Sequence, residues 1–467
     1  MNDWAAVVLA AGLGTRMKSK QPKVLHRICG RAMGAHVTYV IAEAGVTRTA
    51  IVVGKGAVEV RAGLGEGFTY VEQTKQLGTG HALVQSRDAL ENAAQHVIVA
   101  NGDIPLVRSE SLGALMARHL EAGAAVTVLT SSGGPVDGLG RVVRDEGGRI
   151  KAIVEEAELP EALRDIDEIN VGAYCFDAAW LWPALEELSP GKRGELYLTN
   201  LVALAYDSGR PTASVTVADP SEALGVDDRV RLADAEAAMR QRIRRRWMLE
   251  GVTIVDPPST YIDVDVRLGR DSIIHPNSSI LGTSTIGEDC EIGPGSIISS
   301  SSIGSRVRVL ASVIEDSVIE EDVSVGPYSH LRREAHIEAG ARLGNFVEVK
   351  KSRFERGSVA SHFSYIGDAT VGRRANIGAG TITCNFDGVL KHPTVIGEGA
   401  LIGSDTMLVA PVTVGAGAKT GAGAVVTEDV AAGATVVGVP ARPLEKKRPA
   451  SRAPRASQPR DPAKRKV

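Results

Sequence analysis

The sequence predicts an α/β protein with two differently built halves: a mostly parallel, Rossmann-like α/β sheet, then a parallel β-helix of hexapeptide repeats. Two observations predict this. Short apolar runs separated by helix-compatible stretches recur up to about Gly225, which indicates buried parallel strands. From about Ile262 to Val426 an apolar residue stands at almost every sixth position, a period that fits neither a helix nor an alternating strand.

Shifts in composition divide the chain into four segments. We expect the sheet domain over residues 1–226, a linker helix over 227–250, the β-helix over 251–443 and a disordered basic tail over 444–467. Apolar residues at three- and four-residue steps predict the helix, and its arginines favour a solvated or salt-bridged face over an anion site. The tail lacks periodicity, and a solubilising role is favoured over contact with anionic partners.

Composition and charge exclude several classes of protein. The net charge of −3 argues against a protein that coats nucleic acid. The four cysteines lie far apart without CxxC spacing, which indicates reduced thiols and neither a disulfide framework nor a zinc site. The apolar stretch Ala5 to Ala11 lacks a basic flank and is too short for a bilayer. We therefore expect a cytoplasmic protein without membrane insertion or nucleic-acid partner.

The first apolar run carries the clearest functional signal. AAVVLAAG leads into GLGTRM, and Pro22 and Lys23 follow shortly after. A Gly-rich turn after a first strand can wrap a phosphate with backbone N–H groups, while Arg16 and Lys23 supply positive charge for a triphosphate. Met17 stands where a dinucleotide fingerprint has its third glycine. The string resembles sugar-1-phosphate nucleotidyltransferases.

Further motifs follow in the order of that family. The resemblance implies that Gln73 and the run QLGTGHA read the base and ribose, and that Asp103 in NGDIPL holds Mg²⁺ against the phosphates. Asp227 in GVDDR stands where relatives usually carry Asn as the second metal ligand, and the choice between Asp227 and Asp228 stays open. Asn101 replaces an aromatic residue. The residues implied in binding UTP or the sugar nucleotide are Leu9, Ala10, Ala11, Gly12, Lys23, Gln73, Gly78, Thr79, Asn101, Gly140, Glu155, Asn170 and Asp227.

The chemistry of this half follows from its charged groups. Nucleotidyl transfer needs charge neutralisation and in-line positioning more than a protein nucleophile. We expect an oxygen of the sugar phosphate to attack the α-phosphate of the nucleoside triphosphate and expel pyrophosphate. Arg16 and Lys23, together with Mg²⁺ on Asp103 and Asp227, would stabilise the developing charge, so no covalent intermediate is required.

The six-residue ladder predicts which side chains face the core of the β-helix. Small residues follow many of these positions, as turns require. The repeats resemble those of acyltransferases that use acyl-CoA, and a purely structural solenoid is the alternative. The predicted inward positions are Ile262, Leu268, Ile274, Ile280, Ile286, Ile292 and Ile298; Val313, Ile319, Val325, Leu331, Ile337, Leu343 and Val349; Val359, Tyr365, Val371, Ile377 and Thr383; and Ile396, Ile402, Leu408, Val414, Thr420 and Val426.

Two cations in the ladder point to a phosphate site. Arg332 follows one inward position and Lys350 another, eighteen residues or one full coil later, so they should stack about 4.8 Å apart. Like charges at that distance repel unless an anion lies over them. The alternative is a solvated pair screened by neighbours such as Glu334 and Glu348.

Breaks in the ladder indicate where a second site lies. His362 stands in SHFSYIGDA, where the spacing is disturbed, and NIGAGTITCNFDG precedes an eleven-residue break before Ile396. A single histidine is more often structural than catalytic. However, a loop that leaves a β-helix commonly builds a site or reaches a neighbouring subunit.

Four further motifs extend the resemblance to residues 5 to about 430: GNFVEVKK, SHFSYIGDA, NIGAGTITCNFDG and GSDTMLVAPVTVG. The chain resembles the bacterial bifunctional glucosamine-1-phosphate N-acetyltransferase/N-acetylglucosamine-1-phosphate uridyltransferase family. This implies a left-handed coil, a homotrimer, acetyl-CoA and UTP as co-substrates, and His362 as the base that deprotonates the amine of glucosamine-1-phosphate. The product, N-acetylglucosamine-1-phosphate, would then be converted to UDP-N-acetylglucosamine.

The resemblance also assigns the remaining residues of this second site. Arg332 and Lys350 would grip the sugar phosphate. The sugar would be held by Tyr365, Asn376 and Asn385, with Phe386 beside them, and the coenzyme A groove would be lined by Ala379, Ser404, Ala422 and Arg442.

Three departures from the family bear on these assignments. Phe386 stands where the family usually has Tyr, so a hydroxyl contact is lost. A strict six-residue phase points Tyr365 inward, whereas the resemblance puts its hydroxyl at the substrate. The family's late arginine aligns with Val439, and whether Arg442 replaces it stays open.

Two other functions compete with a two-site enzyme. One is a single-activity sugar-1-phosphate nucleotidyltransferase whose β-helix is structural or regulatory; such relatives lack the HFSY and NFDG features. The other is a non-catalytic regulatory subunit, against which the presence of Arg16, Lys23 and Asp103 argues.

Overall fold

The structure is a computed structural model that describes residues 3–134, 136–191 and 194–444. The chain folds as two compact units. The first runs to Glu250 and adds Tyr261–Val266 and Ile280–Gly282, and the second comprises the other described residues. The predicted tail, apart from its first residue, lies outside the described residues. No helix in the described part of the chain is long and apolar enough to cross a membrane.

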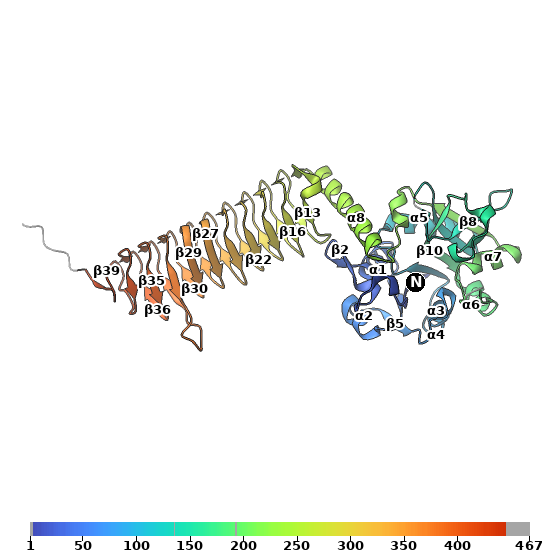
Figure 1. The fold of residues 1–467 in the computed structure, drawn as a ribbon, viewed down its shortest axis with the longest axis horizontal. Coiled ribbons are helices and arrows are strands. Elements are labelled where there is room, and N and C mark those ends of the chain that lie inside the picture. The colour runs from blue at the N-terminus through green and yellow to red at the C-terminus, as the bar shows by residue number, and fades with distance from the viewer. Residues whose placement is uncertain (1–2, 135, 192–193, 445–467) are drawn as a thin grey trace, which may run out of the picture. The chain divides into compact units, whose positions relative to one another are not determined.

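The first unit alternates strands and helices, as the apolar runs predicted (Figure 1). Its strands are β1 (Trp4–Ala10), β2 (Arg27–Ile28), β3 (Arg31–Ala32), β4 (Thr49–Val53), β5 (Thr69–Glu72), β6 (His96–Asn101), β7 (Val126–Ser131), β8 (Arg141–Arg144), β9 (Ile150–Val154), β10 (Ile169–Asp177) and β11 (Thr212–Thr216). Its α-helices are α1 (Met33–Glu43), α2 (Ala57–Leu64), α3 (Thr79–Val84), α4 (Arg87–Leu90), α5 (Ser109–Ala122), α6 (Ala178–Glu186), α7 (Asn200–Asp207) and α8 (Arg229–Leu249). Short 3-10 turns are η1 (Thr15–Met17), η2 (Lys23–Leu25), η3 (Glu156–Glu158), η4 (Glu161–Leu163) and η5 (Pro220–Ala223), and η6 (Pro257–Ser259) follows later in the chain.

A mostly parallel sheet forms the centre of this unit. Its strands lie in the order β11-β7-β10-β6-β1-β4-β5. Strand β1 pairs in parallel with β4 and β6, whereas β10 runs antiparallel to β6 and β7. Because β1, β4 and β6 are parallel, the loops after them meet at one edge of the sheet, where α/β proteins bind ligands.

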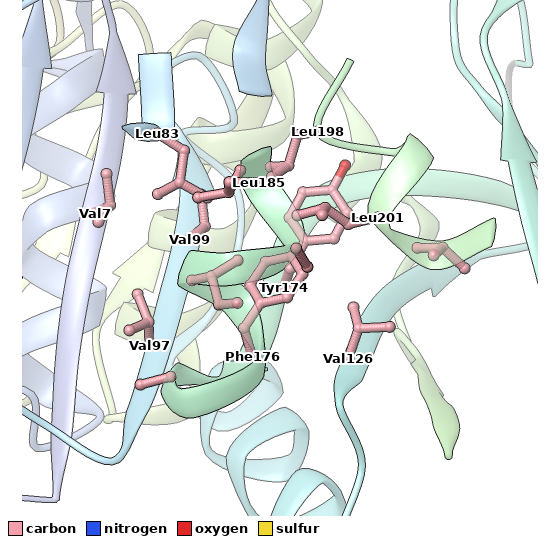
Figure 2. Packing of buried hydrophobic residues seen from close by; sticks show 14 of the residues in the cluster. Val7, Leu83, Val97, Val99, Val126, Tyr174, Phe176, Leu185, Leu198 and Leu201 are labelled. Carbon is pink, nitrogen blue, oxygen red and sulfur yellow. The ribbon is translucent and has the colours of Figure 1, made fainter. Parts of the chain in front are cut away.

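Both faces of the sheet are buried, which explains the near-continuous apolar strands. Alternate residues of β1 enter two different cores: Val7 packs in one and Val8 in the other. Figure 2 shows the first core, in which Phe176 and Tyr174 of β10 pack with valines of β1, β6 and β7. The sheet therefore forms a rigid floor for the loops at its edge.

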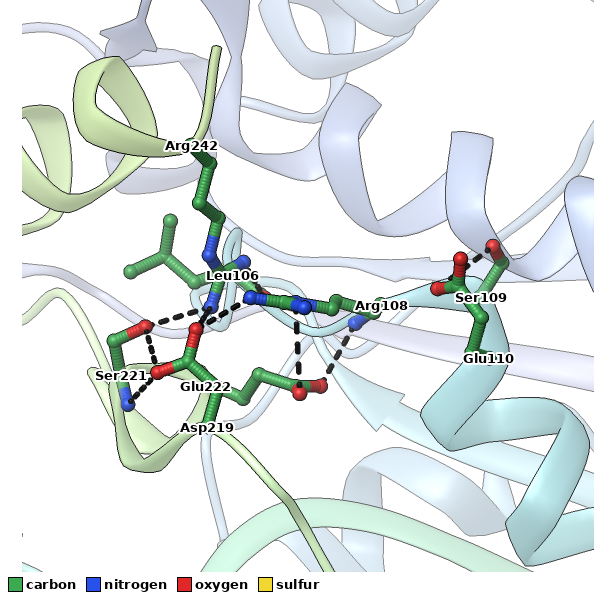
Figure 3. Close-up of polar contacts among 8 residues, drawn as sticks. All are labelled: Leu106, Arg108, Ser109, Glu110, Asp219, Ser221, Glu222 and Arg242. Carbon is green, nitrogen blue, oxygen red and sulfur yellow. Dashed lines mark hydrogen bonds and ion pairs between the residues drawn. The ribbon is translucent and has the colours of Figure 1, made fainter. Parts of the chain in front are cut away.

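Polar contacts attach α8, which lies in the segment predicted as a linker, to the sheet domain (Figure 3). Arg242 of α8 donates to Asp219 at 3.1 Å, to Ser221 at 2.7 Å and to the carbonyl of Leu106. Arg108 shares the Asp219 carboxylate at 2.5 Å. Burial and the nearby Arg108 cation lower the pKa of Arg242. This is the salt-bridged face that the arginine pattern favoured.

After residue 250 the chain winds through short strands. They are β12 (Thr253–Ile254), β13 (Tyr261–Ile262), β14 (Arg267–Leu268), β15 (Ile273–Ile274), β16 (Ser279–Leu281), β17 (Thr285–Ile286), β18 (Glu291–Ile292), β19 (Ile297–Ser299), β20 (Ser302–Ile303), β21 (Arg308–Val309), β22 (Val313–Glu315), β23 (Val318–Ile319), β24 (Ser324–Val325), β25 (His330–Arg332), β26 (His336–Ile337), β27 (Arg342–Lys350), β28 (Arg353–Phe354), β29 (Val359–Gly367), β30 (Ala369–Val371), β31 (Asn376–Ile377), β32 (Ile382–Cys384), β33 (Thr394–Ile396), β34 (Leu401–Ile402), β35 (Met407–Val409), β36 (Val412–Val414), β37 (Lys419–Thr420), β38 (Val425–Val426), β39 (Thr435–Val437) and β40 (Arg442–Pro443). Each coil pairs in parallel with the next, as β14 with β17 and β17 with β20. The second half is therefore a parallel β-helix, as the period of six predicted.

The inward positions differ from the prediction at three places. Val313, Val359 and Tyr365 are not buried, and the side chains that fill the core are their successors Ile314, Ala360 and Ile366. The cause is turns one residue shorter than the hexapeptide, which put the buried Ile319 five residues after Ile314 and the buried Val371 five residues after Ile366. Each short turn shifts the series of buried positions by one residue. A strict count of six across such a turn therefore selects the residue next to the buried one.

One hairpin projects from the coils between β32 and β33, and Figure 1 shows it in orange. Its strands meet at an antiparallel bridge between Phe386 and Lys391. The ladder break therefore corresponds to a folded loop, with β33 resuming the coil afterwards.

Candidate active sites

A cavity of about 550 Å³ lies in the first unit, at the edge where β1 and β6 end. Its volume suits a small molecule. Every residue predicted for the nucleotide site lines it: Leu9, Ala10, Ala11, Gly12, Arg16, Lys23, Gln73, Gly78, Thr79, Asn101, Asp103, Gly140, Glu155, Asn170 and Asp227. The structure thus brings together residues that are spread over more than two hundred positions of the sequence.

Four charged groups neutralise one another in this cavity. The Lys23 ammonium contacts Asp103 Oδ2 at 2.5 Å and Asp227 Oδ1 at 2.9 Å, and Arg16 contacts Asp227 Oδ2 at 3.0 Å. Burial opposes the charge on Lys23, but the two carboxylates outweigh it and raise the pKa of Lys23. Burial likewise opposes the charge on Asp227, yet the Lys23 and Arg16 cations hold its pKa below the ordinary value.

The geometry separates Asp227 from Asp228. Asp228 Oδ1 accepts from the backbone N–H groups of Val230 and Arg231, both at 2.9 Å, and so caps the first turn of α8. Asp227, one residue earlier, faces the cavity. The helix cap uses one carboxylate and leaves the other for the site.

The donors fit a magnesium ion that is completed by substrate. Asp103 and Asp227 already share a cation, the Lys23 ammonium, so their oxygens converge on one position. Mg²⁺ typically takes one or two protein carboxylates together with substrate phosphates. Within the described ranges no group of three or more histidine, cysteine, aspartate or glutamate side chains could hold a metal, so these two carboxylates would need the phosphates.

A turn beside the cavity is held in shape by Gln73. Its Nε2 donates to the carbonyl of Gly78 at 3.0 Å and contacts His81 Nδ1 at 3.0 Å. Gly78 has φ 102°, and a Cβ there would lie 2.5 Å from the carbonyl oxygen of Leu196. Only glycine meets both conditions, which explains this position of the QLGTGHA run.

Sequence reasoning missed part of the opposite wall. Thr199, Tyr197 and Glu195 also line the cavity, and Thr199 Oγ1 donates to Glu155 Oε1 at 2.7 Å. Burial raises the pKa of Glu155. The stretch ELYLTN that carries these residues has no glycine turn or charge pair to reveal it.

In the second unit, Arg332 of β25 pairs in register with Lys350 of β27, as the eighteen-residue spacing predicted. Glu348 accepts from Arg332 at 3.0 Å and 2.6 Å, so one cation is screened. Lys391, which the sequence analysis missed, lies against Lys350; first Lys391, then burial and Arg332, lower the pKa of Lys350, which Asp368 partly offsets. Three cations face two carboxylates, and the excess positive charge favours an anion.

The Tyr365 ring turns outward, and this settles the conflict between ladder phase and resemblance. A Cβ on Gly367 would lie 2.4 Å from the Tyr365 hydroxyl and 2.8 Å from Asn385 Nδ2. The hydroxyl thus sits over Gly367 and beside Asn385, whose amide donates to Asp368 Oδ2 at 2.5 Å. Tyr365, Asn385 and Asp368 therefore surround the face next to Lys350.

His362 lies at an exposed corner of the coil, in register with Asn345 of the preceding coil. Its Nδ1 is 2.9 Å from Asn345 Oδ1. When Asn345 accepts the Nδ1 proton, Nε2 is left with a free lone pair. The structure thus provides a histidine oriented by an amide, which is the arrangement that a general base needs.

The predicted coenzyme A residues continue the column of His362 along the coils. The pairing of Val359 with Asn376, of Ile377 with Ile402 and of Leu401 with Lys419 fixes the register. Counted from these pairs, equivalent turns of successive coils carry His362, Ala379, Ser404 and Ala422. The three residues that follow the histidine in this column therefore have small side chains.

Three predicted residues lie at the margin of this arrangement. Arg442 of β40 pairs with Val437, near the end of the column, and its Nη1 is 3.7 Å from Glu428. Phe386 is 59% exposed on the hairpin. Asn376 pairs with Val359 at the start of β29, away from the end that carries Tyr365.

Comparisons with known proteins agree with both halves. Residues 6–207 match the MobA-like NTP transferase domain, and residues 265–300 and 393–428 match the bacterial transferase hexapeptide family. The chain is 47% identical to the bifunctional protein GlmU of Heliobacterium modesticaldum, over 94% of this chain and 96% of the relative. It belongs to the GlmU family. The corresponding proteins of Geobacillus sp. and Brevibacillus brevis are 46% and 45% identical, over 92% and 88% of this chain and 94% and 89% of their own lengths.

Membership of the GlmU family confirms the predicted activity. The chain is a bifunctional enzyme with acetyltransferase and uridyltransferase activities that produce UDP-N-acetylglucosamine. The competing predictions, a single-activity nucleotidyltransferase and a non-catalytic subunit, fit these relatives less well because the match spans both halves.

Proposed function

We propose that the cavity of the first unit transfers the uridylyl group and that the His362 corner of the β-helix transfers the acetyl group. The observation that carries this division is the convergence of all predicted nucleotide residues on one cavity. An oxygen of the N-acetylglucosamine-1-phosphate phosphate attacks the α-phosphorus of UTP. The bond to the β-phosphate oxygen breaks, and pyrophosphate leaves with its electron pair.

Lys23 and Arg16 are the protein's cations for this step. They leave their carboxylate partners for the phosphates of UTP and stabilise charge on the transferring group. Asp103 and Asp227 would hold Mg²⁺, which supplies further charge neutralisation when bound. The Gly-rich turn after β1 and the turn held by Gln73 position the nucleotide, since both line the cavity.

For acetyl transfer, the amine nitrogen of glucosamine-1-phosphate attacks the thioester carbon of acetyl-CoA. His362 Nε2 removes a proton from that amine during the attack. The carbon–sulfur bond breaks and coenzyme A leaves as the thiolate. The Asn345 contact supports this role because it orients the ring. Arg332, Lys350 and Lys391 bind the sugar phosphate, and Tyr365 and Asn385 contact the sugar beside Phe386. Asn376 is left out of this set because it pairs with the other end of β29. The cofactor runs along Ala379, Ser404 and Ala422 towards Arg442.

We further propose that the enzyme is a homotrimer that acts in the cytoplasm. Exposed aromatic residues beside His362 support assembly: Tyr328 and Phe346 stack at 5.4 Å, and Phe363 is 66% exposed. A second copy would remove this surface from water and cover an otherwise open site. We also propose domain boundaries at residues 226, 250 and 443, with α8 connecting the two catalytic domains.

Omission of single substrates tests the proposed division. With glucosamine-1-phosphate and acetyl-CoA alone, the enzyme should release coenzyme A and no pyrophosphate. With N-acetylglucosamine-1-phosphate, UTP and Mg²⁺, it should release pyrophosphate and need no acetyl-CoA. If neither product forms unless all four substrates and Mg²⁺ are present together, the two reactions do not take place at separate sites.

A further inference from the structure

One side chain holds the hairpin between β32 and β33 in its shape. Asp387 Oδ1 accepts from the backbone N–H groups of Val389 at 2.8 Å and Leu390 at 2.7 Å. Its Oδ2 is 2.6 Å from His392 Nε2, which donates because an ionised carboxylate only accepts. The Leu390 N–H, the His392 ring and the Val389 N–H hold the pKa of Asp387 well below its usual range.

The base of the hairpin is tied to the coil that carries the cations. The backbone N–H of His392 donates to the Asn385 carbonyl at 2.8 Å, and the Asn385 side chain donates to Asp368 at 2.5 Å. Asp368 in turn faces Lys350. The hairpin is therefore anchored at its base by Asp368 and closed at its tip by Asp387.

Hydrophobic packing within the chain does not hold this hairpin. Val389 is 83% exposed, Leu390 62% and Phe386 59%, so its apolar side chains point to solvent. The tip is held instead by polar contacts: the Asp387 carboxylate bonds and a backbone hydrogen bond from the Asp387 N–H to the Leu390 carbonyl at 3.1 Å. Yet the strand that leaves the tip carries Lys391, which lies against Lys350.

We propose that Asp387 is a positioning residue for the acetyltransferase site, acting through Lys391. By closing the hairpin it places the Lys391 ammonium beside Lys350 and Arg332, where the three bind the sugar phosphate. A lysine on an open loop would have to be ordered when substrate binds, and that entropic cost would weaken binding. This inference rests on the proposed function of the β-helix site.

The test compares Asp387→Ala, Lys391→Ala and the double variant in the full-length enzyme, with Asp387→Asn as the conservative variant. Asp429→Ala is the matched control, because Asp429 is also exposed and accepts from a backbone N–H, that of Thr413, at 2.7 Å. Coenzyme A release is measured against glucosamine-1-phosphate concentration. Hydrogen exchange at Val389 and Leu390 reports on the hairpin itself.

We expect Asp387→Ala to raise the KM for glucosamine-1-phosphate about tenfold, with a smaller change in kcat, because it displaces one charged contact to phosphate. Lys391→Ala should have a similar effect, and the double variant should be no worse than Lys391→Ala. Exchange at Val389 and Leu390 should accelerate in Asp387→Ala and in the double variant, and should not change in Lys391→Ala. Asp387→Asn should give an intermediate KM and an intermediate exchange rate. Asp429→Ala should leave both unchanged, and no variant should change pyrophosphate release.

Two outcomes separate the positioning role from the proposed function. If Lys391→Ala raises KM but Asp387→Ala does not, or if their effects multiply, the positioning role is overturned and the phosphate site stands. If neither variant changes KM although exchange accelerates in Asp387→Ala, then Lys391 does not bind the phosphate, and the proposed cation cluster is itself wrong.

Discussion

The two sites handle positive charge in opposite ways. In the cavity of the first unit, Lys23 and Arg16 are neutralised by Asp103 and Asp227 before any substrate arrives. On the β-helix, Lys350 stands beside Lys391, and this cation cluster is only partly balanced. The first site exchanges its ion pairs for phosphate and metal, whereas the second attracts phosphate with uncompensated charge. The difference fits a triphosphate that brings its own counter-ion and a monoester that does not.

The largest test of this comparison removes the proposed base of the second site. His362→Ala should lower the rate of coenzyme A release by about 10²–10⁴-fold, the usual rate contribution of a general base. Pyrophosphate release from N-acetylglucosamine-1-phosphate should stay unchanged. Both products are measured on the same preparation. His330→Ala serves as control, since His330 is also an exposed histidine of the β-helix, paired with Glu315 at 3.1 Å. An equal loss in both histidine variants would argue for a structural effect.

The next test breaks the charge balance of the first site. Lys23→Ala should lower pyrophosphate release about 10²–10³-fold, as expected for loss of one preorganised charge on a transition state. It also leaves Asp103 and Asp227 without their shared cation, so Mg²⁺ should bind the free enzyme more tightly. Calorimetric titration with Mg²⁺ measures this directly. Unchanged metal affinity would mean that Lys23 and the metal do not share those oxygens.

A third test concerns the close packing of the second site. Gly367→Ala adds a Cβ where the Tyr365 hydroxyl now lies, at 2.4 Å. The ring must move, and we expect kcat/KM for acetyl transfer to fall about tenfold, the value of one lost hydrogen bond to substrate. Tyr365→Phe isolates the hydroxyl and should give a loss of similar size. If Gly367→Ala has no effect while Tyr365→Phe does, the ring tolerates the extra methyl group.

These residues also show how far the sequence reaches. The residues predicted for the nucleotide site line one cavity, because most of them lie in short motifs at the ends of strands. The six-residue count points Tyr365 into the core, against the resemblance, because the turn between the buried Ile366 and Val371 is one residue short and no residue type marks it. Lys391 was missed because only the folding of the hairpin brings it to Lys350.

A smaller effect is expected from the departure at Asp227. Asp227→Asn removes one negative charge beside Lys23 and Arg16, so UTP should bind more tightly when metal is absent, while Mg²⁺ should bind less tightly. The change should be about tenfold or less in each affinity, since one partly exposed charge pair is involved. Titrations of UTP with EDTA and with Mg²⁺ give both values. If the ratio of UTP affinity with Mg²⁺ to UTP affinity with EDTA is the same in wild type and variant, the second carboxylate does not affect binding of UTP or metal.

The smallest expected effect is a pH dependence of the second site. Because Lys391 lowers the pKa of Lys350, Lys350 loses its charge at a lower pH than an ordinary lysine. The KM for glucosamine-1-phosphate should therefore rise as pH increases, before the ordinary lysine value of about 10.4 is reached. In Lys391→Ala the midpoint of this rise should move to higher pH. A midpoint that stays in place would assign the titration to another group.

We infer that the chain carries two separable sites joined by a released intermediate. The most direct measurement mixes His362→Ala with Asp103→Ala and supplies glucosamine-1-phosphate, acetyl-CoA, UTP and Mg²⁺. Neither variant alone should make UDP-N-acetylglucosamine, whereas the mixture should make it after a lag in which N-acetylglucosamine-1-phosphate accumulates. A mixture that stays inactive, although each variant retains its own half-reaction, would contradict two sites that exchange a released intermediate.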